Sequence, residues 1–187
     1  GAVTAPWTEG SGAMKLEERI AKHRRMAESY RDKYVLQKVA EGESYDEWEF
    51  TDDAVYTSPY FVAEQELVLK DVATHWDMAA TVEAKAYGIT FPDWKPVDYK
   101  VWPAENGFVM RYRWQGTNVN TGEVMGFYSI SFVDTNEDCQ ITHWSTYVND
   151  EEYGPFLEAA IGARGPFHGD SYMQALANHF EKHGLTF

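Results

Sequence analysis

The sequence predicts an α+β fold in which a curved antiparallel sheet wraps around N-terminal helices and a helical tail follows. Three observations support this prediction. The chain from residue 15 to residue 87 is rich in helix-forming residues and contains one strand-like stretch. Four strand-like segments separated by turn residues come next. After residue 149 the pattern becomes helical again.

The first expected element is helical. Residues 15–41 are strong helix formers with loosely periodic apolar positions, which predicts one or two helices ending at Gly42. A short helical turn at 45–50 leads to an expected strand at 54–61. Pro59 lacks the amide hydrogen that a central strand donates, so this strand is expected at a sheet edge or a bulge.

A second helical region is expected at 64–87, ending at Gly88. The strands after it form a meander, because each pair is separated by a short segment rich in Asn, Asp, Gly or Pro. These strands are expected at residues 97–102, 108–115, 124–133 and 140–148. The tail is expected to form helices at residues 153–161 and 171–183.

The length of 187 residues suits one domain with extensions. We expect an N-terminal extension at 1–14, a main domain at 15–150 and a helical tail at 151–187 that caps the domain. The extension lacks a basic segment followed by an apolar one, and no uncharged apolar run is long enough to cross a bilayer. A cytoplasmic location is therefore predicted, and the single cysteine, Cys139, agrees with it.

Charge and aromatic content narrow the choice of partners. Thirty acidic residues against sixteen basic ones give a formal net charge of -14, which repels nucleic-acid phosphates and anionic membrane surfaces. We therefore expect neither nucleic acid nor a membrane as a partner. Aromatic residues make up 16% of the chain, and such rings often line small-molecule pockets. A small aromatic substrate is the expected ligand.

Three stretches of sequence carry a family resemblance, at residues 34–42, 51–56 and 141–148. With the order of elements, they resemble the nuclear transport factor 2-like superfamily, which includes SnoaL-like polyketide cyclases, ketosteroid isomerase and scytalone dehydratase. The resemblance covers about residues 30–148 and implies a cone-shaped sheet around a cavity. It also implies a homodimer or a homotrimer. Because this fold hosts enzymes, binding modules and structural subunits, function must be argued from the cavity.

Side chains alternate between the two faces of a strand, so the pattern separates cavity-lining residues from outward-facing ones. The expected inner set is Phe108, Met110, Tyr112, Trp114, then Gly126, Tyr128, Ile130, Phe132, then Thr142, Trp144, Thr146 and Val148. Arg111, Arg113 and His143 are then expected to point outward, where dimer contacts would form.

Phenolic hydroxyls on the expected inner faces are the main candidates for chemistry. The predicted catalytic residues are Tyr34, Tyr56, Lys95, Tyr112 and Tyr128. By resemblance, Tyr34 and Tyr128 match the two oxyanion donors of ketosteroid isomerase, whereas Ser58 occupies the position of its base and cannot remove a carbon-bound proton unaided. The predicted substrate-binding residues are Ser58, His75, Tyr99, Trp114, Trp144, Thr146 and His168.

Each candidate also has a structural interpretation. A single inner tyrosine is often a core residue bonded to backbone, and four hydroxyls in one apolar cavity favour a binding pocket only when taken together. Lys95 fits an exposed loop lysine, and His75 fits a helix surface. His179 and His183 are four residues apart, but two histidines without a third ligand do not predict a metal site. No metal and no cofactor are expected.

The predicted function is that of a cofactor-independent lyase acting on a small phenolic substrate. Loss of a benzylic hydroxyl through a quinone methide would be followed by carbon–carbon cleavage that releases formaldehyde. The aromatic content, the N-terminal extension and the tail after Val148 resemble the bacterial diarylpropane lyases that act on lignin-derived dimers. The alternatives are a scytalone-type dehydratase or polyketide cyclase, and a non-catalytic binding or partner subunit.

Overall fold

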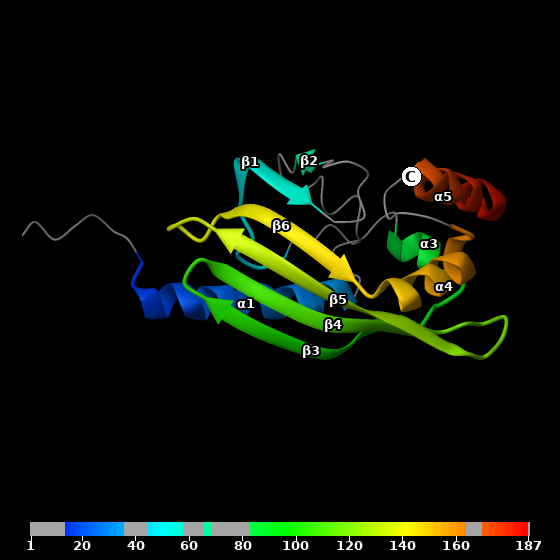
Figure 1. Cartoon of the computed structure of the whole chain (residues 1–187), viewed down its shortest axis with the longest axis horizontal. Helices are drawn as coiled ribbons and strands as arrows, with labels where there is room; N and C mark the ends of the chain where they lie inside the picture. The colour runs from blue at the N-terminus through cyan, green and yellow to red at the C-terminus, as the bar shows by residue number, and fades with distance from the viewer. Residues whose placement is uncertain (1–13, 36–44, 58–65, 69–82, 164–169, 187) are drawn as a thin grey trace, which may run out of the picture.

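The computed structural model describes residues 14–35, 45–57, 66–68, 83–163 and 170–186. Its strands are β1 (Phe50–Thr57), β2 (Glu66–Val68), β3 (Lys95–Ala104), β4 (Gly107–Thr117), β5 (Val124–Thr135) and β6 (Ile141–Val148). Its helices are α1 (Leu16–Val35), α3 (Ala84–Gly88), α4 (Asp150–Ile161) and α5 (Asp170–His183). Figure 1 shows one curved sheet with α1 across one face and α3, α4 and α5 grouped beyond one end. The α+β class predicted from the sequence is confirmed.

The six strands form one sheet in the order β2-β1-β6-β5-β4-β3. Strands β3 to β6 make the predicted antiparallel meander. Gly107 enables the β3–β4 turn, since it has a φ of 143° and an added Cβ would lie 1.9 Å from the Val133 carbonyl oxygen. In contrast to the expectation of a purely antiparallel sheet, β1 pairs with β6 in parallel. Local sequence carries no signal for pairing between strands so distant along the chain.

Before residue 90, two of the predicted elements differ from those in the structure. Residues 66–68 lie in the predicted helix 64–87, but they form strand β2 and pair antiparallel with β1. Pairing with an available sheet edge outweighs the high helix propensity of Glu66 and Leu67. The helical turn expected at 45–50 is instead a tight turn with Glu47 at a φ of 62°, and Phe50 already begins β1.

The helices after the sheet begin and end close to the predicted positions. Asn149 caps α4, because its side chain accepts a hydrogen bond from the Glu151 amide at 3.1 Å. Gly162 ends the helix in the left-handed conformation at a φ of 71°. Within the described part of the chain, no helix is long and apolar enough to cross a membrane.

The inner face of the sheet is the face that carries Tyr112 and packs against α1. Strand β4 alternates as predicted, with Phe108, Met110, Tyr112 and Trp114 buried. On β6, Trp144 and Thr146 share this face, because they pair with inner residues of β5.

On β5 the predicted alternation is wrong by one residue. Ser129 pairs with Tyr112 and Ser131 pairs with Met110, so the inner residues of β5 are Phe127, Ser129, Ser131 and Val133. Tyr128 and Phe132 therefore lie on the outer face. Aromatic residues occur on both faces of β5, so ring content could not identify the buried one.

Candidate functional site

A row of hydroxyl groups crosses the inner face of the sheet. The hydroxyl oxygen of Tyr112 lies 3.4 Å from that of Tyr30 on α1 and 3.4 Å from Ser131 Oγ. Ser131 Oγ lies 3.0 Å from Thr146 Oγ1. Thr146 in turn hydrogen-bonds to the Tyr56 phenol. We call these five residues the hydroxyl row. It links β1, β6, β5, β4 and α1, in a setting otherwise made of aromatic rings.

Aromatic packing holds the hydroxyl row in place. The indole of Trp144 contacts the rings of Tyr30 and Tyr56 edge-on, at centroid distances of 5.6 and 5.7 Å. Tyr99 stacks on Tyr112 at 5.5 Å and donates its hydroxyl hydrogen to the Ala27 carbonyl at 2.7 Å. These contacts favour one orientation for each ring, which preorganises the hydroxyls.

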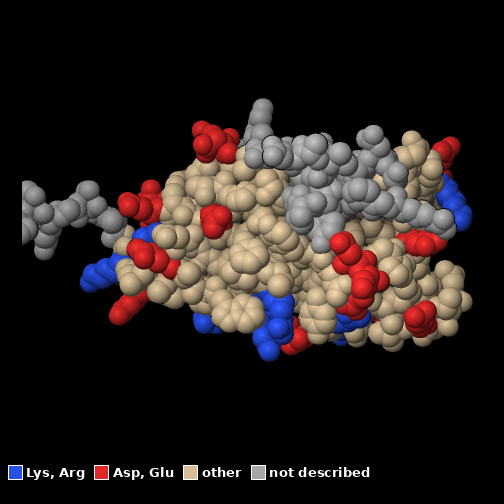
Figure 2. Space-filling view, in the orientation of Figure 1, with Lys and Arg blue, Asp and Glu red and all other residues tan. Residues whose placement is uncertain are grey.

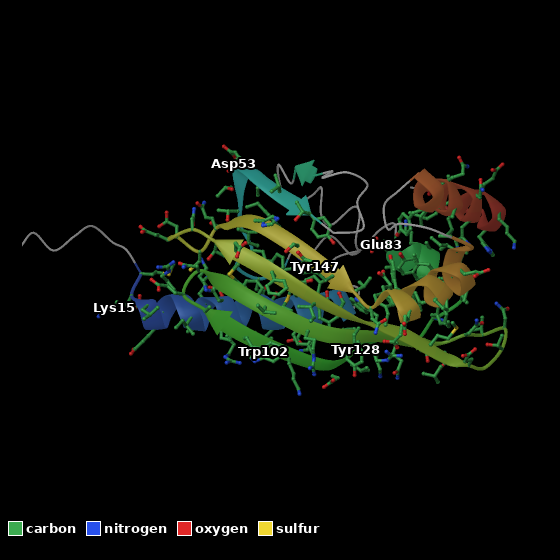
Figure 3. The ribbon with its side chains drawn as sticks, viewed as in Figure 1. Lys15, Asp53, Glu83, Trp102, Tyr128 and Tyr147 are labelled. Atoms are coloured by element: carbon green, nitrogen blue, oxygen red, sulfur yellow. The ribbon has the colours of Figure 1, made fainter. Side chains whose placement is uncertain are left out.

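A carboxylate lies near one end of the hydroxyl row. Glu83, next to the first turn of α3, accepts a hydrogen bond from the Tyr172 hydroxyl at 3.0 Å. The hydroxyl oxygens of Tyr172 and Tyr87 are 2.7 Å apart. Tyr153 of α4 interacts electrostatically with Tyr87. We call Glu83, Tyr87, Tyr153 and Tyr172 the carboxylate cluster, and Figure 3 labels Glu83 beside α3.

Electrostatic interaction connects the cluster to the row. Burial raises the pKa of the Tyr56 phenol, and the negative charge of Glu83 raises it further, although the Thr146 hydrogen bond opposes this. The pKa of Tyr172 is raised by burial and then by Glu83, and the pKa of Tyr153 by burial and then by Tyr87. All three phenols therefore stay protonated at neutral pH. The Tyr56 phenol can donate a hydrogen bond to a ligand, whereas the Tyr172 phenol already donates to Glu83. The Glu83 carboxylate can accept a proton.

The structure brings six of the predicted site residues together. The phenols of Tyr56 and Tyr112 belong to the hydroxyl row, as does the Thr146 hydroxyl. The other three contact these residues through their rings: Trp144 on Tyr56, and Tyr99 and Trp114 on Tyr112.

Two predicted catalytic residues lie elsewhere. Tyr128 is on the outer face, 39% exposed, and its hydroxyl donates to Asp98 Oδ2 at 3.4 Å. The expectation that it lines the cavity is therefore wrong, because the register of β5 turns it outward. Lys95 is exposed at the start of β3, which agrees with the structural interpretation of a solvated lysine.

The remaining predicted residues lie outside what the structure describes. Ser58, His75 and His168 fall in residues that are not described, and Tyr34 lies in α1 with its side chain not described. Their predicted roles remain predictions.

Sequence reasoning missed the carboxylate cluster and Tyr30. A signal existed for part of it, since Glu83 and Tyr87 are four residues apart in a region predicted to be helical, which places them on one helix face. Nothing local pointed to Tyr172, which reaches Glu83 from 89 residues away. Among the described residues, no group of three or more His, Cys, Asp or Glu side chains is arranged to hold a metal ion.

No protein-family model matches the sequence, and no curated protein matches it. Solved structures, in contrast, do match this chain. A phenazine biosynthesis-related protein from Pseudomonas aeruginosa superposes with a TM-score of 0.50 and 15% identity, over 87% of this chain and 95% of that one. An NTF2-like protein from Anabaena variabilis matches with a TM-score of 0.50 and 14% identity, over 76% of this chain and 98% of that one. At this identity the likeness concerns the fold alone, and the chain has the nuclear transport factor 2-like fold.

Proposed function

We propose that this protein is a cofactor-independent lyase that acts on a small phenolic compound with a benzylic hydroxyl group. One observation carries the proposal: a carboxylate, Glu83, interacts electrostatically with neutral phenols in an aromatic interior. A proton acceptor beside hydrogen-bond donors is the arrangement that acid–base elimination requires. The rings around it suit a substrate that is itself aromatic.

Binding would use the aromatic wall and the hydroxyl row. The half-buried Tyr56 is the member of the row that electrostatics links to Glu83, so its phenol is the donor proposed to hold a substrate oxygen. Thr146 and Ser131 orient that phenol through their hydroxyls. A donor held in place before the reaction stabilises an oxyanion without the cost of reorganising water.

In the first half of the proposed reaction, Glu83 removes the proton of the substrate phenol. The phenolate electrons then expel the benzylic hydroxyl, which takes the proton from Glu83 and leaves as water. The product of this step is a quinone methide, stabilised at its carbonyl oxygen by a hydrogen bond from Tyr56. Lys95, one of the predicted catalytic residues, is exposed at the start of β3, so the proposal assigns proton transfer to Glu83.

In the second half, Glu83 removes the proton of a terminal CH₂OH group. The carbon–carbon bond breaks, formaldehyde leaves, and the bonding electrons restore the aromatic ring. The ring oxygen then recovers the proton from Glu83. The balance is one diol giving one conjugated alkene, one water and one formaldehyde, and the substrate ring serves as the electron sink.

A dehydratase of the scytalone type or a polyketide cyclase is the second candidate. The same carboxylate and the same phenols would suffice for the loss of water alone, because that reaction needs only one proton acceptor and one oxyanion donor. The two candidates differ in whether carbon–carbon cleavage follows.

The decisive experiment incubates the full chain with a 1,2-diaryl-1,3-propanediol that carries a free para-hydroxyl group. The proposal expects equal amounts of formaldehyde and of an ultraviolet-absorbing stilbene, and no reaction of the para-methoxy analogue, which has no phenol to ionise. Water loss without formaldehyde would identify the dehydratase. No turnover of this diol or of other phenolic alcohols would leave a binding or partner subunit as the function.

A further inference from the structure

A cleft lies between α4, α5 and the loop that joins β4 to β5. Its volume is about 490 Å³, within the range of small-molecule sites. Figure 1 shows these elements together beyond the end of the sheet. None of the hydroxyl-row or carboxylate-cluster residues lines it. The cleft is therefore separate from the proposed active site.

One side of the cleft is apolar. Ile89, Ala159 and Ile161 form part of the lining, and Val119 at the β4–β5 loop adds an aliphatic side chain that is 59% exposed. The Val119 amide donates to the Thr90 carbonyl at 3.0 Å, which fixes the loop against the segment after α3. An exposed aliphatic side chain held at a cleft gains from contact with an apolar ligand, because that contact removes both surfaces from water.

The other side of the cleft is rich in donors. Lys182 and His183, in the last turn of α5, both line it, and Lys182 forms no ion pair with any residue that the structure describes. The His179 ring lies 4.5 Å from the His183 ring, and its Nε2 donates to the Ala86 carbonyl at 2.9 Å. Asn178 accepts from Gln174 through its side-chain oxygen, which leaves its NH₂ group to donate. Glu158 is the acidic residue of this lining.

We propose that this cleft binds a small organic acid with an apolar ring. The ring would pack against Ile89, Val119 and Ala159, and the carboxylate would interact with Lys182, with the Asn178 amide or His183 as a second donor. The carboxylate end would face α5 and the ring would face α4 and the loop. Such a ligand would contact both α4 and α5.

Isothermal titration with phenylacetate tests the proposal, and phenylacetamide serves as the neutral probe of the same shape. Saturable binding of phenylacetate is expected, with phenylacetamide about tenfold weaker or more, since a charge-assisted hydrogen bond contributes about that factor. Lys182→Ala should weaken phenylacetate binding by about the same factor. Lys100→Ala, an exposed lysine on β3, is the matched control and should bind normally.

Filling the apolar side supplies an independent variant. Ala159→Trp should abolish binding by occupying the cleft, and circular dichroism checks that it folds. If it does not fold, Val119→Glu places a negative charge at an exposed position and should repel phenylacetate. Glu83→Gln should bind phenylacetate as the unmodified protein does. The proposal is overturned by absence of saturable binding, by equal binding of the two probes, or by loss of binding only in Glu83→Gln.

Discussion

The two faces of the sheet carry the same kinds of side chain in opposite settings. On the inner face, the Tyr112 ring is 2% exposed and its hydroxyl meets other hydroxyls. On the outer face, Tyr128 and Trp102 are exposed, and the Arg111 guanidinium lies 5.9 and 6.0 Å from their ring centroids. Figure 2 shows this side as a mostly uncharged surface with basic side chains along its lower edge. Tyrosine content alone therefore does not mark a site, and the strand face decides what each phenol can do.

The largest expected effect comes from replacing Glu83, the carboxylate of the carboxylate cluster. Glu83→Gln keeps the size of the side chain but removes the proton acceptor, so turnover of the phenolic diol should fall about 10³-fold. The rate of formaldehyde release measures it. Glu123→Gln, at an exposed position of the β4–β5 loop, is the control and should retain full activity. Equal activity in both variants would remove Glu83 from the mechanism.

The next largest effect is a difference in stability between variants of the inner face and variants of the outer face. Tyr112→Ala removes a buried ring and should lower the free energy of unfolding by about 3–5 kcal/mol. Tyr128→Ala removes an exposed ring and should cost about 1 kcal/mol or less. Urea denaturation of the two variants gives both values. Similar losses would mean that Tyr128 itself is buried in solution, within the dimer contact proposed below.

Substituting tyrosine by phenylalanine on each face tests the contribution of the hydroxyl groups themselves. Tyr56→Phe should lower kcat/KM about 10²-fold, because it deletes one donor to the developing oxyanion. Tyr128→Phe should leave kcat/KM unchanged, although sequence reasoning had assigned it a catalytic role. Activity that falls in Tyr128→Phe and not in Tyr56→Phe would reverse the assignment of faces.

The outer face is proposed to pair with a second copy of the chain. Exposed rings of Trp102, Phe132 and Tyr147 lie on it together with both signs of charge, since Arg111 lies 3.1 Å from Asp98. A self-complementary surface of this kind suits a two-fold dimer. Phe132→Asp should weaken association by about 2 kcal/mol or more, measured by sedimentation equilibrium. A protein that is monomeric at micromolar concentration would exclude the pairing.

The smallest effect concerns a buried histidine on the inner side. His23 donates through Nδ1 to the Ala104 carbonyl and accepts through Nε2 from the Thr135 hydroxyl, and burial lowers its pKa below 6.5. Below pH 6.5 the unfolded chain gains a proton that the folded chain resists, so stability falls as the pH decreases. The free energy of unfolding should therefore be lower at pH 5.5 than at pH 7.5 by the contribution of this group. His23→Gln should lack that component in urea denaturation at the two pH values.

Local patterns predicted the meander and two of its inner faces. Alternation placed Tyr112 correctly on β4, where one face is distinctly more apolar, and it placed Trp144 and Thr146 correctly on β6. On β5 the inner positions include Ser129 and Ser131, small polar residues that hydroxyl partners satisfy. The pattern of β5 alone does not reveal these partners, because they lie on other strands.

Only part of the candidate site could be predicted from the sequence, for a related reason. Tyr112 belongs to a strand whose buried face can be inferred from its own alternation. Glu83 and Tyr172 become neighbours through tertiary packing of α3 and α5, which no local period encodes. The predicted helix over 64–87 also concealed the strand at 66–68, because edge pairing depends on a distant partner.

The bond between Tyr172 and Glu83 has a consequence for biosynthesis. Residues 16–148 contain the described strands of the sheet and α1, so a nascent chain can assemble that framework before α5 has been synthesised. The phenol that contacts Glu83 belongs to α5 and follows the last strand. The contact between Tyr172 and Glu83 therefore forms only after the sheet is complete, and a chain terminated between residues 148 and 172 would lack it.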